Sequence, residues 1–357
     1  MARIRPQLGL ACRADQHPEP QSVRTIMTPP IRIGVLGAAR ITPAALIKPA
    51  AKLANVEIVR VAARNRTRAQ EFADEHGIAN VSDSYEQLIE ADDVDVVYNP
   101  LPMSLHAEWT IAALRAGKHV FCEKPFASNA GEAAEMVRVA EEEDRVLGEA
   151  FHYRYHPMFL RILDEVASGR IGTLERVEGV FNVPISRQSP SGALDIRWDY
   201  GASGGALMDL GCYPMSWVRH LTGEEPTVVS AEAVEDPENI DAFLTCELAF
   251  PGGATGSVTT AMERGPEIGL TVRGSHGSIV ADNPMAPQNG NRLTITTEQG
   301  STSGPIDAGI SYDHMVRAFI DHLVLGNPFP TSGQDSINNM AAIDAVYLAA
   351  GLPIRGT

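Results

Sequence analysis

The sequence predicts an α/β protein in two parts: an N-terminal Rossmann domain with a doubly wound parallel sheet, and a C-terminal α/β domain with an open, mostly antiparallel sheet. Two observations carry this prediction. From residue 31 to about 150, short β-branched runs alternate with helical stretches, which is typical of parallel strands joined by helical crossovers. Beyond about residue 151, longer runs alternate between apolar and polar residues, as antiparallel strands do.

The first part begins with a strand that leads directly into a helix. Thr42 followed by Pro43 predicts the N-cap and first position of that helix. The segment EAFHYRYHP is interpreted as a strand that ends before Pro157. The expected strands are IRIGVLG, VEIVRVAAR, VDVVYNP, KHVFCEKP and VLGEAFHYRY, and the expected helices lie near 42–53, 66–76, 105–116 and 130–143.

In the second part, the glycine-rich segment 200–205 leads into an expected helix at 206–221, and a last helix is expected at 337–350. Pro251, Gly252 and Gly253 predict a hairpin turn between two strands. No repeat of fixed period is visible. The expected strands are LERVEGVFN, TVVSAEAVE, IDAFLTCELAF and ATGSVTTAM.

The 357 residues are sufficient for two domains. We expect a Rossmann domain at 31–150 and a substrate-binding and oligomerisation domain at 151–357. Residues 1–30, which contain a second candidate start of translation at Met27, are expected to be a disordered extension; an ordered arm in oligomer contacts is the alternative. This segment has no apolar block of signal-peptide length.

Composition excludes several classes of protein. Lys and Arg number 29 against 45 Asp and Glu, a net charge of -16, which disfavours nucleic-acid binding. No apolar run reaches the roughly 18 residues of a membrane helix. The cysteines lie far apart without CxxC spacing, as expected of reduced thiols in a cytoplasmic protein; they are Cys12, Cys122, Cys212 and Cys246. His152 and His156, on the expected strand, do not converge on a metal.

The turn after the first strand is a candidate dinucleotide site. A glycine there lets backbone N–H groups and a helix N-terminus approach a pyrophosphate. Read as the fingerprint G-x-G-x-x-G/A, the turn runs Gly37, Ala39, Thr42, so only the first glycine is kept. An ordinary tight turn is the alternative, but the position at the start of the first βαβ unit favours a nucleotide.

The turn after the second strand indicates which nucleotide. NAD sites place an Asp or Glu there for the ribose hydroxyls. This turn instead offers Arg64, Arg66 and Arg68, with no acidic residue between Glu57 and Glu71. A guanidinium that binds a 2′-phosphate contributes about 1.5–3 kcal/mol. We therefore expect the cofactor to be NADP, with NAD as the alternative cofactor. If no nucleotide binds here, these arginines are simply the solvated start of a helix.

Three segments, GKHVFCEKP, EAFHYRYHP and GGALMDLGCYP, resemble motifs of a known family of enzymes. They are similar to motifs of the Gfo/Idh/MocA oxidoreductases, the family of glucose-fructose oxidoreductase and inositol dehydrogenase, and the resemblance runs from residue 31 to the C-terminus. It implies that Lys124, in the EKP motif, lies between nicotinamide and substrate. The D-x-G-x-Y form at Asp209 to Tyr213 resembles the branch that contains dihydrodiol and xylose dehydrogenases, in which tyrosine replaces histidine as proton-transfer group.

Oxidation of an alcohol requires a base beside its hydroxyl. An ordinary tyrosine pKa of about 10 would have to fall to about 7 or 8, and we expect the Lys124 ammonium to lower the pKa of Tyr213 in this way only if it is partly desolvated. Asp209, four residues earlier on the same helical face, would orient substrate or keep Lys124 charged. His106 is a candidate cofactor contact or a core residue. Many relatives carry Met where this chain has His152.

The resulting hypothesis is an NADP-dependent oxidoreductase that transfers hydride between a cyclic polyol and nicotinamide, as a homodimer or homotetramer. Alternatives are a trans-dihydrodiol dehydrogenase, a sugar oxidoreductase that retains its NADP, and a non-catalytic NADPH-binding regulator. The candidate residues are, for catalysis, Lys124, Tyr213 and Asp209; for the cofactor, Gly37, Ala38, Ala39, Arg40, Ile41, Arg64, Arg68, Asn99, Leu101, His106, Glu123 and Lys124; and for substrate, Arg154, Arg197, Trp198, Asp209 and Tyr213.

Overall fold

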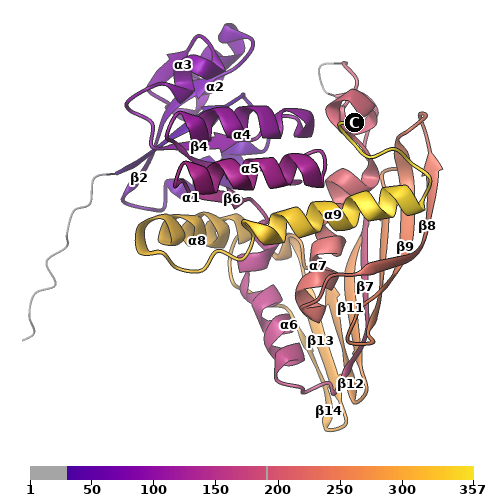
Figure 1. The fold of residues 1–357 in the computed structure, drawn as a ribbon. Coiled ribbons are helices and arrows are strands. Elements are labelled where there is room, and N and C mark those ends of the chain that lie inside the picture. Colours follow the sequence, from indigo (N-terminus) through magenta and orange to yellow (C-terminus); the bar gives the residue numbers. More distant parts are fainter. Residues whose placement is uncertain (1–29, 190–191) are drawn as a thin grey trace, which may run out of the picture.

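A computed structural model describes residues 30–189 and 192–357 (Figure 1). The prediction of a disordered extension, with its candidate start at Met27, falls almost wholly on residues 1–29, outside this part of the chain. The described protein is built on two sheets, one in each part of the molecule, and helices from both halves of the sequence pack between and around them. The predicted fold class is confirmed.

The first sheet has six parallel strands in the order β3-β2-β1-β4-β5-β6. Reversal of the strand order between β1 and β4 is the topological switch point, where ligands bind in such sheets. The short strand β3 was not predicted. The strands are β1 (Ile31–Leu36), β2 (Val56–Ala62), β3 (Asn80–Ser82), β4 (Val96–Asn99), β5 (His119–Cys122) and β6 (Leu147–Glu149).

Helices cover both faces of this sheet. The predicted helix at 66–76 is found at those bounds because Asn65 caps its start and Gly77, in the left-handed region, ends it. Thr42 and Pro43 stand at the N-cap and first position of the helical segment as predicted, but Thr42 has a helical backbone and its side chain makes no capping hydrogen bond to the π-helical turn that follows. The elements are η1 (Pro43–Ile47), α1 (Lys48–Ala50), α2 (Arg66–His76), α3 (Tyr85–Ile89), α4 (His106–Arg115) and α5 (Ala130–Glu142).

The second sheet has eight strands in the order β14-β13-β12-β11-β7-β10-β9-β8, antiparallel except for the pair β7 and β10. The hairpin predicted at Pro251 to Gly253 joins β9 to β10. The strands are β7 (Leu174–Asn182), β8 (Thr227–Glu235), β9 (Asp241–Ala249), β10 (Thr255–Ala261), β11 (Glu267–Gly274), β12 (Gly277–Asp282), β13 (Arg292–Thr297) and β14 (Gly300–Gly304).

The segment after β6 corrects the predicted strand. β6 ends at Glu149, and residues His152–Tyr155 form a 3-10 turn, η3, that leads into helix α6 (Pro157–Ala167). His156 caps this helix by accepting a hydrogen bond from the N–H of Met158. The aromatic residues that suggested a strand, Phe151 and Tyr153, are instead fully buried by the turn between the two sheets.

One face of the second sheet is covered by helix α7 (Cys212–Thr222), which is continuous with the π-helical turn η6 (Leu207–Gly211). The two lie close enough to β7 that a Cβ at Gly179 would come within 2.6 Å of the Pro214 side chain. This packing fixes η6 and α7 against the sheet, and the predicted helix at 206–221 corresponds to their combined length.

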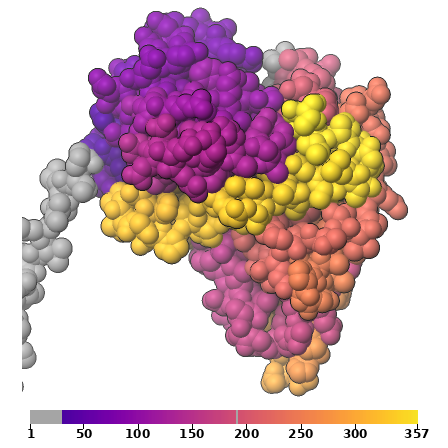
Figure 2. All heavy atoms as spheres, viewed as in Figure 1, coloured from indigo at the N-terminus to yellow at the C-terminus, as the bar shows by residue number. Residues whose placement is uncertain are grey.

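The C-terminal helix α8 (Ser311–Leu325), which was not predicted, returns to the first sheet, whereas α9 (Gln334–Ala349) also contacts strand β8 of the second sheet. Phe319 of α8 stacks on Phe121 of β5, with ring centroids 4.3 Å apart. Helix α9 packs along α5. In Figure 2 the C-terminal residues form a yellow band between the indigo-to-magenta first part and the orange second part. None of the helices in the described residues is long and apolar enough to cross a bilayer.

Candidate active site

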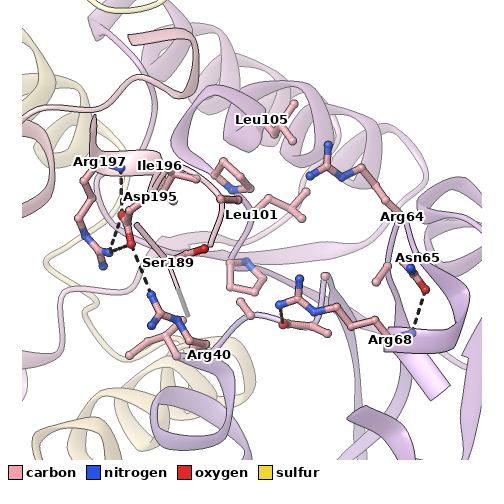
Figure 3. Close-up of a pocket in the computed structure, with 18 of the residues that line it drawn as sticks. Arg40, Arg64, Asn65, Arg68, Leu101, Leu105, Ser189, Asp195, Ile196 and Arg197 are labelled. Atoms are coloured by element: carbon pink, nitrogen blue, oxygen red, sulfur yellow. Dashed lines mark hydrogen bonds and ion pairs between the residues drawn. The ribbon is translucent and has the colours of Figure 1, made fainter. Parts of the chain in front are cut away.

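A cavity of about 540 Å³ lies at the carboxyl edge of the first sheet, beside the switch point between β1 and β4 (Figure 3). Its walls come from the turns after β1, β2 and β4 and from a segment after β7. The predicted cofactor residues in its lining are Gly37, Ala38, Ala39, Arg40, Ile41, Arg64, Arg68 and Leu101. The turns that sequence reasoning treated separately therefore meet in one place.

Gly37 has a φ of +78°, which favours glycine, and a Cβ there would lie 3.0 Å from the Leu101 side chain. Its N–H donates to the carbonyl of Ala62 at 2.6 Å, so the turn is tied to the neighbouring strand. The chain can thus pass close to a ligand at this point, as a bound pyrophosphate requires.

The three arginines after β2 have different environments. Arg68 donates to the carbonyl of Ala38 at 2.8 Å, which joins two walls of the cavity. Arg66 forms an ion pair with Asp83 and is not part of the lining. Arg64 is exposed and lines the cavity, and no other described residue forms a hydrogen bond or ion pair with its guanidinium. Arg64 is therefore available to an anionic ligand.

Asn99 and His106 were predicted to bind the cofactor, but neither lines the cavity, and both lie behind its wall. The Asn99 amide donates to the His106 carbonyl at 3.2 Å, and its oxygen accepts from the N–H of Leu101. The His106 ring is buried between the carbonyls of Leu101 and Pro125, at 2.8 and 2.9 Å. Burial lowers the pKa of His106 to about 4. Both residues support the loop that follows β4.

Lys124, directly after β5, meets Asp209 of η6. Its Nζ lies 2.9 Å from both Oδ1 and the backbone carbonyl of Asp209. Arg197 donates to the other carboxylate oxygen at 2.6 Å. Burial opposes the charge of Lys124, but the Asp209 carboxylate outweighs it and the pKa of Lys124 is raised. Burial likewise opposes ionisation of Asp209, yet Lys124 and Arg197 hold its pKa below the ordinary range.

Glu123, the first residue of the EKP motif, does not line the cavity. It is buried behind Lys124 and accepts a hydrogen bond from the Tyr98 hydroxyl at 2.7 Å. Burial raises its pKa. Glu123 therefore supports the backbone at Lys124 from the core side.

Tyr213, in the first turn of α7, is buried with its ring centroid 5.1 Å from Lys124 Nζ. The expected lowering of its pKa is wrong: burial raises the pKa of Tyr213 well above 10, and the proximity of Lys124 does not reverse this. The hydroxyl lies 3.2 Å from Nε2 of His152, a contact that the predicted strand did not suggest.

A second cavity, of about 570 Å³, adjoins the first and shares Arg40, Ser189, Asp195 and Arg197 with it. Asp209 lines this second cavity as well. Figure 3 shows Arg40 and Arg197 on either side of Asp195, which pairs with both, at 3.7 and 3.1 Å. The apolar part of its lining comprises Phe181, Val183, Pro184, Ile185, Leu210, Ile268 and Met285.

Two predicted substrate residues lie elsewhere. Trp198 is a core residue whose indole N–H donates to the carbonyl of Ile185, while Arg187 covers its ring. Arg154 lies over the ring of Phe159, outside the lining of both cavities. An aromatic ring beside an arginine has the same sequence signature in a core as in a sugar site, so the pattern alone could not separate the two cases.

A buried ion pair supports η6, and sequence analysis did not predict it. Asp241 and Arg355 are fully buried and lie 2.8 Å apart. The other oxygen of Asp241 accepts from the N–H of Leu207 at 2.7 Å. Residues near the C-terminus thus fix the turn that carries Asp209. In the described part of the chain, no group of three or more side chains is arranged to hold a metal ion.

A nucleotide-type cavity at the switch point, beside a lysine and carboxylate pair, defines a dinucleotide-dependent oxidoreductase. Comparison with known proteins leads to the same class of protein. Residues 31–151 match the model of the oxidoreductase family with an NAD-binding Rossmann fold, and residues 159–280 match the GFO/IDH/MocA C-terminal domain. The chain belongs to the GFO/IDH/MocA oxidoreductase family, as the resemblance predicted.

Relatives with assigned activities cover much of the chain. D-xylose 1-dehydrogenase (NADP+) 2 of Haloferax volcanii is 34% identical over 320 residues, 89% of this chain and 96% of the relative. Trans-1,2-dihydrobenzene-1,2-diol dehydrogenase of Bos taurus is 32% identical over 62% of this chain and 64% of its own length. The crystal structure of KijD10, a 3-ketoreductase from Actinomadura kijaniata in complex with NADP and TDP-benzene, is similar with a TM-score of 0.81 at 30% identity, covering 90% and 98% of the two chains.

Proposed function

We propose that this protein is an NADP-dependent dehydrogenase that transfers hydride between a ring carbon of a cyclic polyol, an aldose or related sugar, and the nicotinamide. The observation that carries the proposal is the contact of Lys124 with Asp209, because Asp209 lines a substrate-sized cavity that adjoins the nucleotide cavity. The names of the xylose dehydrogenase and of the NADP-bound ketoreductase support this class of reaction.

The cavity lining fits NADP. Arg64 and Arg68 would hold the 2′-phosphate, and the backbone from Gly37 to Ile41 would hold the pyrophosphate. The wall directly after β2 is formed by Ala63, Arg64, Asn65 and Arg68 and contains no carboxylate for the ribose hydroxyls of NAD. When bound, the nicotinamide ring accepts or delivers the hydride.

The residues around the second cavity would act on the substrate oxygen. Lys124 is an ammonium at neutral pH because Asp209 raises its pKa, so it donates a hydrogen bond to a carbonyl or alkoxide oxygen. Arg197 holds the other oxygen of Asp209 and would orient neighbouring hydroxyls. Tyr213 would exchange a proton with the reacting oxygen.

A trans-dihydrodiol dehydrogenase is the second candidate, and the apolar lining of the second cavity favours it. Phe181, Ile268 and Met285 offer contact to a hydrocarbon ring, while Arg197 and Asp209 lie at the polar side for two hydroxyl groups. The bovine relative acts, by its name, on such a diol. A sugar with few hydroxyl groups would satisfy the same lining.

Steady-state oxidation of aldoses, inositols and trans-dihydrodiols, with NADP and NAD in parallel, tests the proposal. We expect turnover of a ring alcohol with a clear preference for NADP. NADP that stays bound through purification and gel filtration would identify a sugar oxidoreductase that retains its cofactor. Tight NADPH binding without turnover of any substrate would identify the non-catalytic regulator and refute the dehydrogenase.

We also propose a cytoplasmic homodimer or homotetramer. The face of the second sheet opposite α7 carries the ion pairs of Arg176 with Glu178 and Glu247 and the hydroxyl contact of Thr245 with Thr259, a broad face that a second copy would cover. The family resemblance supports assembly through this sheet. Light scattering that gives the mass of a monomer at all concentrations would contradict it.

A further inference from the structure

A row of alternating charges joins the turn after β1 to Lys124. Arg40, in that turn, has a guanidinium nitrogen 3.7 Å from Oδ2 of Asp195. Asp195 pairs with Arg197 at 3.1 Å, and Arg197 donates to Oδ2 of Asp209 at 2.6 Å. Asp209 in turn contacts Lys124. The row therefore begins at the nucleotide cavity, which Arg40 lines, and ends at the lysine proposed to contact the substrate oxygen.

Asp195 differs from the other members of this row because it faces a cavity that must hold an anion. Its side chain is 8% exposed and contributes to the lining of both cavities. Among the described residues that line the first cavity, Asp195 is the only one with a carboxylate. The phosphates of NADP carry negative charge, so a carboxylate in the wall opposes their binding. Asp195 thus weakens cofactor binding unless a cation offsets its charge.

Asp195 fixes the conformation of Arg197. Its Oδ1 accepts from the backbone N–H of Arg197 at 3.2 Å and from a guanidinium nitrogen of the same residue at 3.1 Å. The backbone bond caps the 3-10 turn η4 (Ile196–Trp198). Nε of Arg197 is thereby directed at Asp209, on the oxygen that Lys124 does not use. Asp195 therefore supports the carboxylate that keeps Lys124 charged.

Arg40 supplies the offsetting charge. Its guanidinium is 67% exposed and lies at the boundary of the two cavities. The 3.7 Å to Asp195 is longer than a hydrogen bond, so the donors of Arg40 are available to a second anion. Arg40 belongs to the turn proposed to hold the pyrophosphate. In Figure 3 it lies across the cavity from Arg64, so a dinucleotide with its 2′-phosphate at Arg64 extends toward Arg40 and Asp195.

We propose that Asp195 is a positioning residue that holds Arg197 and, through it, Asp209. The charge of Arg40 offsets that of Asp195 toward the bound pyrophosphate. This inference rests on the proposed function. Asp195 then weakens cofactor binding while it supports hydride transfer, because it acts on the phosphates by its charge and on Lys124 only through its neighbours. Removal of its charge should change these two properties in opposite directions, whereas damage to the fold lowers both.

The first test is Asp195→Asn, which removes the charge and keeps the oxygen that caps η4. Fluorescence titration should show that the variant binds NADPH about three- to tenfold more tightly than the wild type, with a gain that shrinks as salt is added. Hydride transfer to NADP in a single turnover with a ring alcohol should slow about tenfold. Asp93→Asn is the matched control, because it removes the same charge from a carboxylate that pairs with Arg60 at 2.8 Å, outside the lining of both cavities.

An NADPH affinity that is unchanged or weaker in Asp195→Asn, or a rate of hydride transfer equal to that of the wild type, would overturn the proposed role of Asp195. Asp195→Ser is a second neutral variant, because serine also caps helical turns, and it decides the question if the asparagine variant does not fold. Melting temperature is recorded for each variant.

The second test adds the substitution of Arg40. Arg40→Gln should weaken NADPH binding about tenfold, because the phosphates lose a charge-assisted contact. Asp195→Asn in the same chain should restore the affinity to about that of the wild type, while hydride transfer stays slow. Asp93→Asn added to Arg40→Gln is the control and should restore nothing. A double variant of Arg40 and Asp195 that binds NADPH no better than Arg40→Gln alone would overturn the offset of the two charges.

The third test does not depend on turnover. A crystal structure of Asp195→Asn with NADPH should show the Arg197 side chain in more than one conformation, only one of which contacts Asp209. A single conformation bonded to Asp209 would overturn the positioning role. The expected affinities and conformations in a protein that oxidises no ring alcohol would refute the proposed function instead.

Discussion

The Lys124 ammonium lies 2.9 Å from Oδ1 of Asp209, which is 85 residues further along the chain. Lys124 follows the fifth strand of the first sheet, whereas Asp209 belongs to a π-helical turn that packs on the second sheet. The pair therefore forms only when the two sheets are packed together. The charge state of the lysine is a property of the assembled fold, since Asp209 is what offsets the effect of burial on its pKa.

Arg64→Ala should weaken NADP(H) binding about ten- to a hundredfold and leave NAD(H) binding almost unchanged. The guanidinium would lose a charge-assisted hydrogen bond to the 2′-phosphate of about 1.5–3 kcal/mol. Fluorescence titration with both reduced cofactors measures the two affinities. Arg66→Ala is the matched control, because Arg66 lies in the same turn but pairs with Asp83 outside the cavity lining. Equal effects on both cofactors would contradict the role of Arg64.

Asp209→Asn should lower the pH at which kcat for carbonyl reduction begins to fall on the alkaline side of its profile. In the wild type the Asp209 carboxylate raises the pKa of Lys124 against the effect of burial; without the carboxylate the main raising effect is lost, while the lowering effects of burial and of Arg197 remain. Lys124 then loses its proton at a lower pH and ceases to donate. The pH profile of kcat for reduction measures the shift, with Asp199→Asn, an exposed carboxylate at a nearby turn, as control. An unshifted limb would show that Asp209 does not control the charge of Lys124.

Glu149→Gln should change the pH dependence of stability. Glu149 is fully buried at the end of β6, and burial raises its pKa well above 4.5. The folded protein therefore keeps a proton that the unfolded chain loses above about pH 4.5. Stability falls as pH rises from there through the raised pKa, by up to ~1.4 kcal/mol per pH unit. Removing this group should make the variant increasingly stable relative to the wild type as pH rises.

Urea denaturation of wild type and Glu149→Gln at several pH values measures this difference. Glu298→Gln is the control, because Glu298 is exposed in the turn between β13 and β14. A constant difference between Glu149→Gln and wild type across the pH range would mean that Glu149 is charged in the folded protein.

Local sequence signals predicted much of the fold. Helix α2 has both its capping residue and its terminal glycine in the sequence, and strand β7 alternates along most of its length. Helix α8 was missed because its apolar face packs on the first sheet, far away in sequence, and the turn at His152–Tyr155 was mistaken for a strand because aromatic residues fill a core in either conformation.

Candidate site residues that belong to short sequence motifs could be proposed from the sequence. Lys124, Asp209 and the turn at Gly37 come from short motifs: Gly37 lines the first cavity, Asp209 lines the second, and Lys124 contacts Asp209. The contact of Tyr213 with His152, the pairing of Asp195 with Arg40 and Arg197, and the support of Leu207 by Asp241 depend on elements that meet only in the folded chain. The pKa of Tyr213 was predicted in the wrong direction because the depth of its burial is not visible in the sequence.

The most direct test of the account is hydride transfer by Lys124→Met, followed through NADPH absorbance in a single turnover with a ring alcohol that the wild type oxidises. Methionine keeps the unbranched shape and most of the length of the side chain but cannot donate to the substrate oxygen or pair with Asp209. We predict a loss of about a hundredfold or more in the rate with NADPH affinity close to that of the wild type. The melting temperature should fall, because Asp209 keeps only Arg197 as an ion-pair partner among the described residues, so the rate is measured at a temperature where the variant is folded. A variant that transfers hydride at the wild-type rate would contradict the central role of Lys124.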